Sequence, residues 1–133
     1  MSELSIISSQ IQGKGSVTVL HLKGQFDRIT ANLVLDRARQ SHEDGAKYLL
    51  LDLSDVDMLT SSGLLAIQSV FKLLTPESDL QIMHHHHEEP YKSPYLKLVC
   101  PNPQIYYVLN IAGFLQNLLI YNNMDEAVKS FVD

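Results

Sequence analysis

The sequence contains a single cysteine, Cys100, and no CxxC pair. One cysteine cannot form an intramolecular disulfide, which excludes a disulfide-stabilised scaffold and favours a reducing, cytoplasmic setting. Basic residues are also few, because ten Lys and Arg stand against fifteen Asp and Glu and give a net charge of −5 with His neutral. This balance excludes the basic footprint that is typical of nucleic-acid-binding domains.

Long hydrophobic runs are absent as well. The longest aliphatic stretches, such as Leu49–Leu51, are far shorter than the roughly 20 residues that cross a bilayer. The opening Met1–Ser5 has no basic stretch followed by an apolar one, so we expect no secretory signal. A length of 133 residues with 45% hydrophobic residues is enough for one core, and we expect residues 1–133 to form a single domain.

The sequence also lacks the usual signatures of catalysis. It has no paired carboxylates, no evident nucleophile and base, and no glycine-rich phosphate loop. Ser61 is not in the Gly-x-Ser-x-Gly turn of the hydrolases. We therefore expect no enzyme and no cofactor.

Six residues of the chain are histidines, and four of them are consecutive, His84 to His87. In an extended segment alternate side chains point to opposite sides, so only neighbours such as His84 and His86 would converge on a metal. We interpret the run as a solvated loop without a physiological metal, with a site at His84 and His86 as the alternative.

The secondary structure follows from the spacing of apolar residues. Residues 4–10 and 17–22 are rich in Val, Ile and Leu and predict a hairpin around Gly13–Gly15. Residues 47–53 are apolar without alternation, which is typical of a strand covered on both faces at the centre of a sheet. Strands are also predicted at 96–100 and 118–121, and helices after Thr30, from Ser62 to Pro76, from Asn102-Pro103 to Gly113 and after Asn123.

This order, β-β-α-β-α-β-α-β-α, predicts an α/β fold in which a mixed sheet of about four or five strands packs with four α-helices. Crossover helices between the later strands require most of that sheet to be parallel. The connection at about 76–94 is longer than the two to six residues that are ordinary between such elements, so we interpret it as an insertion.

A cluster of small residues, Thr60-Ser61-Ser62-Gly63, lies between the central strand and the second helix. The carboxyl end of a strand is where open α/β sheets usually place their sites. Ser61 or Ser62 is predicted to cap the helix, and Gly63 would let the backbone of another protein approach closely. Capping accounts for only one of these residues.

In three places the chain resembles the STAS domain family, and most closely the small anti-sigma-factor antagonists. Asp52-Leu53 followed by Thr60-Ser61-Ser62-Gly63-Leu64 is similar to the family's strand ending and its Asp-Ser-Ser-Gly-Leu motif. Gly24-Gln25-Phe26-Asp27 and Ile111-Ala112-Gly113-Phe114 are similar to two further family segments. The resemblance extends from about Leu4 to Phe131 and implies a STAS fold.

The resemblance also implies a phosphorylation switch. Ser61 corresponds to the serine that an anti-sigma factor, itself a serine kinase, phosphorylates, and a serine phosphatase reverses this step. Position 60 is Thr where the antagonists usually have Asp, so Ser62 and then Thr60 stand as alternative acceptors. The partner-binding residues that the resemblance implies are Asp27, Arg28, Thr60, Ser61, Ser62, Gly63 and Leu64.

Two other classes of function remain open. Because of Thr60 and the insertion, one alternative is a STAS module that is not phosphorylated. It would serve as a scaffold, or sense a ligand or nucleotide, in a transporter-associated or stressosome-like complex. An enzyme ranks third. In each case we expect protein partners, including a homodimer as one arrangement, and no direct nucleic-acid or integral membrane contact.

Overall fold

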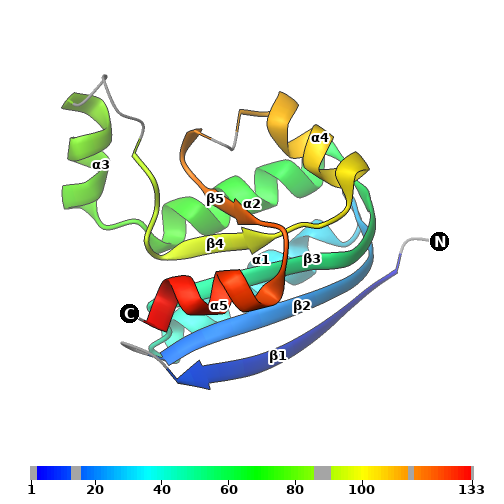
Figure 1. Cartoon of the computed structure of the whole chain (residues 1–133), viewed down its shortest axis with the longest axis horizontal. Coiled ribbons are helices and arrows are strands. Elements are labelled where there is room, and N and C mark those ends of the chain that lie inside the picture. The colour runs from blue at the N-terminus through cyan, green and yellow to red at the C-terminus, as the bar shows by residue number, and fades with distance from the viewer. Residues whose placement is uncertain (1–2, 13–15, 86–90, 114–115, 133) are drawn as a thin grey trace.

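The computed structural model describes residues 3–12, 16–85, 91–113 and 116–132 (Figure 1). Five strands form one sheet in the order β1-β2-β3-β4-β5. They are β1 (Leu4–Gln12), β2 (Ser16–Phe26), β3 (Tyr48–Leu59), β4 (Leu96–Val99) and β5 (Leu119–Tyr121). The first pair is antiparallel and the other three are parallel, so the predicted mixed sheet with β3 at its centre is confirmed.

The helices are α1 (Ala31–Glu43), α2 (Ser61–Leu74), α3 (Glu77–His85), α4 (Pro103–Ile111) and α5 (Met124–Val132). Helices α1 and α2 cover one face of the sheet and α5 crosses the opposite face (Figure 1). The larger core joins Leu51 and Leu53 of β3 to the inner sides of α1, α2 and α4. A smaller core joins Leu50 to α5. The apolar run of β3 is thus covered on both faces, as its sequence predicts.

Strands β2 and β3 are longer than the predicted ranges 17–22 and 47–53. They stay paired as far as Phe26 and Leu59, with register shifts at His21/Lys23 and Gly24/Gln25. Such irregularities interrupt the alternation of inward and outward side chains. The second half of each strand therefore lacks the regular pattern by which a strand is recognised in a sequence. The predicted end of this strand at Leu53 is therefore wrong, because residues 54–59 belong to β3 and only Thr60 separates the strand from α2.

The predicted loop at 76–94 contains a fifth helix, α3, where four helices were expected. The phenolic O–H of Tyr91 donates a 2.6 Å hydrogen bond to the carboxylate of Asp79 in this helix. His84 lies in the last turn of α3, so the extended geometry assumed for the histidine run is wrong there. His86 and His87, like the hairpin turn at 13–15, lie outside the described residues.

The predicted helix starts at Asn102 and Asn123 are confirmed. The side chain of Asn102 accepts a bond from the N–H of Gln104 at 2.9 Å, and that of Asn123 accepts one from the N–H of Glu126 at 2.9 Å. Gly45 and Gly113 follow the ends of α1 and α4 with positive φ angles. None of the helices in the described ranges is long and apolar enough to span a bilayer.

Candidate functional site

The start of α2 carries the three adjacent hydroxyl groups that the sequence singles out. Thr60 is the N-cap, with its backbone extended, and Ser61 and Ser62 are the first two helical residues. The expectation that Ser61 or Ser62 would cap the helix is therefore wrong, since both lie inside it. The side chain of Thr60 makes no capping bond, and its Oγ1 is buried without a hydrogen-bond partner among the residues that the structure describes.

The backbone of this turn is fastened to the end of β2. The N–H of Thr60 donates to the carbonyl of Phe26 at 3.1 Å. A Cβ added to Gly63 would lie 2.7 Å from that carbonyl oxygen and 2.7 Å from a methyl carbon of Leu59. The backbone that approaches Gly63 is thus the chain's own, and the glycine lets β2 and α2 meet closely.

Asp27 and Arg28 lie directly after β2, beside the start of α2. The carboxylate of Asp27 accepts hydrogen bonds from the N–H groups of Ile29 at 3.0 Å and Thr30 at 3.2 Å. Thr30 is the N-cap residue of α1, so the predicted start of this helix after Thr30 is confirmed. Its side chain makes no capping bond, because its hydroxyl donates to the carbonyl of Gln25 at 2.6 Å. Asp27 therefore organises the turn that presents Arg28 to solvent.

A shallow groove of about 300 Å³ runs between α1 and α2 and joins two of the predicted site residues. Arg28 and Ser62 both line it, together with Ala31, Asn32, Leu35, Leu65, Ala66 and Ser69. Ser61 is exposed, whereas Ser62 is half-buried. Leu64 is also half-buried and packs against the larger core. Of the predicted residues, Ser61 is thus exposed, Arg28 and Ser62 line the groove, and Gly63 and Leu64 pack inside the protein.

Sequence reasoning missed the apolar side chains that surround this region. Leu65 in α2 is 63% exposed and Ile29 before α1 is 66% exposed. Leu65 is out of phase with the inward stripe of α2 formed by Ile67, Phe71 and Leu74, and this phase is the signal that could have identified it. Exposed apolar groups in and beside a groove with polar residues are typical of a protein-binding surface.

Three nearby carboxylates have different surroundings. Asp55 and Asp57 are exposed on the outer half of β3, and Asp55 lies in register with Lys23 of β2. Asp52 lies on the same face of β3 as Leu50, which is the face opposite to α2. Asp52 is therefore directed away from α2, and Asp55 has the positively charged Lys23 as its strand neighbour.

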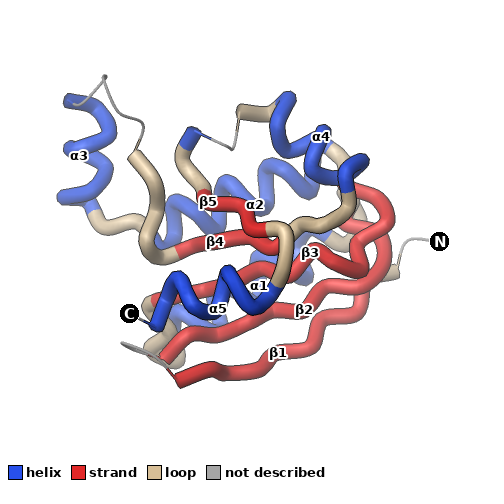
Figure 2. Tube along the Cα trace, viewed as in Figure 1, coloured by secondary structure: helices blue, strands red, loops and turns tan. Residues whose placement is uncertain are grey.

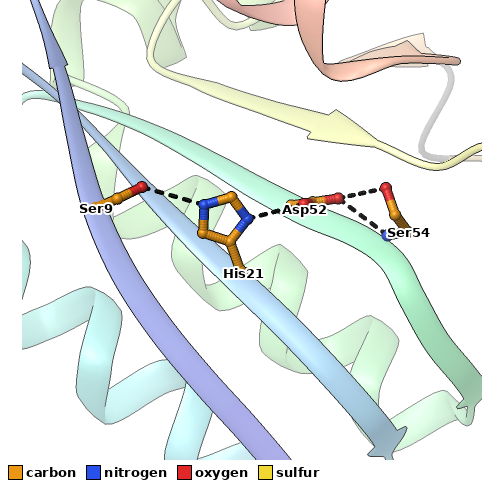
Figure 3. A network of polar contacts seen from close by, with 4 residues as sticks. All are labelled: Ser9, His21, Asp52 and Ser54. Carbon is orange, nitrogen blue, oxygen red and sulfur yellow. Dashed lines mark hydrogen bonds and ion pairs between the residues drawn. The ribbon is translucent and has the colours of Figure 1, made fainter.

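Asp52 instead belongs to a polar network that crosses three strands (Figure 3). Its Oδ2 is 2.9 Å from Nδ1 of His21, and Nε2 of His21 is 3.1 Å from the hydroxyl of Ser9. The other carboxylate oxygen accepts bonds from the N–H and the hydroxyl of Ser54. Sequence reasoning gave His21 no role, because the partners Ser9 and Asp52 are distant along the chain.

These features describe an α/β domain in which a helix with an exposed serine follows the central parallel strand after one residue. A sequence model of the STAS domain matches residues 8–78, which is more than half of the chain. The chain belongs to the STAS domain family. No curated protein matches this sequence.

Solved structures with this fold include anti-sigma factor antagonists. An anti-sigma factor antagonist from Mycobacterium paratuberculosis is 22% identical, with a TM-score of 0.73 over 97% of this chain and 96% of its own. SpoIIAA, an anti-sigma factor antagonist, is 12% identical in its unphosphorylated form, with a TM-score of 0.60 over 94% of each chain. The phosphorylated Bacillus SpoIIAA is 13% identical, with a TM-score of 0.60 over 94% of this chain and 97% of its own. These likenesses establish the fold.

Proposed function

We propose that this protein is an anti-sigma-factor antagonist that acts by binding a protein partner and performs no catalysis. In its unphosphorylated form it binds an anti-sigma factor that is a serine kinase, and the sigma factor is released. The partner inactivates it by phosphorylating Ser61, and a serine phosphatase restores it. The observation that carries the proposal is the exposed Ser61 in the first turn of α2, directly after the central strand of a STAS fold.

The different exposure of the three hydroxyl groups supports Ser61 as the acceptor. A kinase must bring the hydroxyl into contact with the terminal phosphate of ATP, which requires an accessible side chain. Ser61 is exposed, Ser62 is half-buried in the groove, and the hydroxyl of Thr60 is buried. We therefore rank Ser61 before Ser62, and Ser62 before Thr60.

The charges around Ser61 suggest how a phosphate would end partner binding. A phosphoserine carries about −1.5 to −2 charges, and the N-terminus of a helix tolerates them because its N–H groups and dipole are positive. The fold is thus expected to survive. The added negative charge on the exposed Ser61 would repel an acidic partner surface. The proposed partner surface comprises Asp27, Arg28, Thr60, Ser61, Ser62, Gly63 and Leu64, with Gly63 acting through its packing.

A second candidate function is favoured by two observations, one at each end of α2. The buried hydroxyl of Thr60 occupies the position where the antagonists usually have a carboxylate, and α3 adds a helix after α2. A kinase that reads the carboxylate would not accept this chain. The protein would then be an unphosphorylated STAS scaffold, or a ligand- or nucleotide-sensing module, within a larger complex.

Phosphopeptide mapping of the protein isolated from its native host distinguishes the two functions. The proposal expects a single phosphate on Ser61 that is absent from Ser61→Ala and retained in Ser62→Ala, which is the matched neighbour on the same helical turn. Absence of phosphate through growth and stress would contradict it and favour the scaffold. A phosphate that persists in Ser61→Ala but is lost in Ser62→Ala would identify Ser62, which lines the groove, as the acceptor.

A binding assay tests the electrostatic step separately. Ser61→Asp introduces negative charge at the start of α2 without a kinase, and we expect it to weaken binding to the anti-sigma factor at least tenfold. Ser61→Asn introduces a side chain of the same size as Asp without its charge, so it should bind like wild type. Equal affinity of Ser61→Asp and wild type would refute the role of charge.

A further inference from the structure

The outer edge of β1 is the longest unpaired strand edge in the part of the sheet that the structure describes (Figure 2). The nine residues of β1 pair with β2 in one unbroken register from Leu4↔Gly24 to Gln12↔Ser16. At the opposite side of the sheet β5 has three residues. A long, regular strand edge is a template for a further strand, because each free N–H and C=O group lacks a backbone partner.

One hydrogen bond shows which residues of β1 point their backbone outward. The N–H of Gln25 donates to the carbonyl of Glu3 at 2.8 Å, in continuation of the register that pairs Leu4 with Gly24. In an antiparallel pair, alternate residues direct both backbone groups to the neighbouring strand. The backbone N–H and C=O groups of Glu3 and of the odd-numbered residues after it therefore point toward β2. The N–H and C=O groups of Leu4, Ile6, Ser8 and Gln10 face outward.

The edge of β1 lacks the usual features that prevent pairing with another strand. Its sequence, LSIISSQIQ, contains neither a charged residue nor proline, and its register has no bulge. Both faces beside the edge also present apolar groups. Ile7 is 64% exposed on the face that bears His21. On the other face Leu4, Ile6 and Leu33 line a hollow of about 380 Å³ together with the polar residues Asp36, Arg37 and Gln40 of α1.

We propose that β1 pairs antiparallel with β1 of a second copy of this chain, around a two-fold axis at Ile7. Ile6 then lies opposite Ser8 of the second copy, and Leu4 opposite Gln10 of the second copy. These pairs provide about eight backbone hydrogen bonds, since each pair occurs twice and exchanges two bonds. The side chain of Ile7 packs against its own symmetry mate at the close spacing of a non-hydrogen-bonded pair.

The absence of charge identifies the second copy as the occupant. Self-pairing about a two-fold axis places the strand beside an identical strand, so a strand that carried charges of one sign would face the same sign in the second copy. β1 is free of this conflict along all nine residues. The proposed dimer is a single sheet of ten strands, and it uses an edge that includes none of the proposed partner-binding residues.

Sedimentation velocity over a wide range of protein concentration tests the dimer. Wild type is expected to approach twice the monomer mass as the concentration rises. Ile7→Lys places two positive charges face to face, and Gln10→Pro removes an outward N–H while it leaves the bonds to β2 intact, so both should remain monomeric. Ile111→Lys is the matched control, since Ile111 is 71% exposed on α4 and should not affect the dimer. A wild-type monomer at every concentration, or a dimer unaffected by both edge variants, would overturn the proposal.

Disulfide cross-linking tests the register independently of the affinity. In the proposed pairing the two Cβ atoms at position 7 lie about 4.5–5.5 Å apart, close to the range that a disulfide bridges. Ile7→Cys should therefore form a covalent dimer on mild oxidation. Ser9→Cys, on the same face of the strand, should not, because its mate is opposite Ser5. The native thiol, Cys100, is buried and gives no background. Cross-linking of Ser9→Cys but not of Ile7→Cys would refute the register.

Discussion

Replacing Gly63 by alanine should destabilise the protein, although alanine normally favours a helix. The added methyl group would lie 2.7 Å from the carbonyl oxygen of Phe26, well inside van der Waals contact. That oxygen also accepts the hydrogen bond from the N–H of Thr60, so β2 and α2 cannot separate freely. The methyl must therefore displace the backbone at the point where the strand and the helix are joined.

The size of the effect follows from two opposing contributions. Overpacking of one methyl group costs about 1–3 kcal/mol, and the helix propensity of alanine returns up to about 1 kcal/mol. We expect a net loss of about 1–2 kcal/mol in the free energy of unfolding. For a chain of 133 residues this corresponds to a decrease in Tm of about 4–8 °C.

Urea and thermal unfolding followed by circular dichroism measure this loss. Ser62→Ala is the control, because it changes the neighbouring residue of the same turn without a steric conflict, and its Tm should stay close to that of wild type. Amide hydrogen exchange provides a local measurement, since the N–H of Thr60 should exchange faster in Gly63→Ala. A Gly63→Ala protein as stable as wild type would refute the close packing of β2 against α2.

Three further predictions concern other buried polar groups. Thr60→Val removes a buried hydroxyl that has no partner, so urea unfolding should show unchanged stability or a gain of up to about 1 kcal/mol, and a clear loss would reveal an unseen hydrogen bond. Burial lowers the pKa of Lys97, so the unfolded chain holds more protons between that lowered value and the ordinary lysine value. The unfolding free energy of wild type should therefore rise with pH in this window relative to Lys97→Met, and parallel pH profiles would contradict this. Tyr91→Phe removes the bond to Asp79 and should speed hydrogen exchange in α3, whereas Tyr95→Phe should not, and equal exchange in wild type and Tyr91→Phe would exclude this attachment.

The central part of the fold could be predicted because local sequence alone determines it. The apolar run at 47–53 and the stripe of α2 mark a covered strand and an amphipathic helix without reference to the rest of the chain. The continuation of β3 to Leu59 could not be predicted, since register shifts in its pairing with β2 set its outer pattern. Helix α3 was missed because Pro76 indicates the end of α2 and equally the beginning of a helix. The carbonyl of Pro76 in fact accepts bonds from the N–H groups of Asp79 and Leu80.

The candidate site shows the same division between local and long-range information. The motif at 60–64 locates the start of α2, but the phase of the helix determines that Ser61 is exposed and that Ser62 faces the groove. The identity of the N-cap shifts by one residue because the strand before it is longer than predicted. The pairing of His21 with Asp52 depends on strand order, which no local pattern contains.

The order of strands in the sheet has a consequence for synthesis of the protein. β3 lies between two parallel neighbours, and the second of them, β4, begins only at Leu96. On the ribosome, one edge of the apolar segment Tyr48–Leu53 therefore stays open until about 40 more residues have emerged, which takes several seconds at about 5–20 residues per second. The antiparallel hairpin of β1 and β2 has no such delay. We expect the nascent chain to be most prone to aggregation, and most dependent on chaperones, in the interval between completion of β3 and emergence of β4.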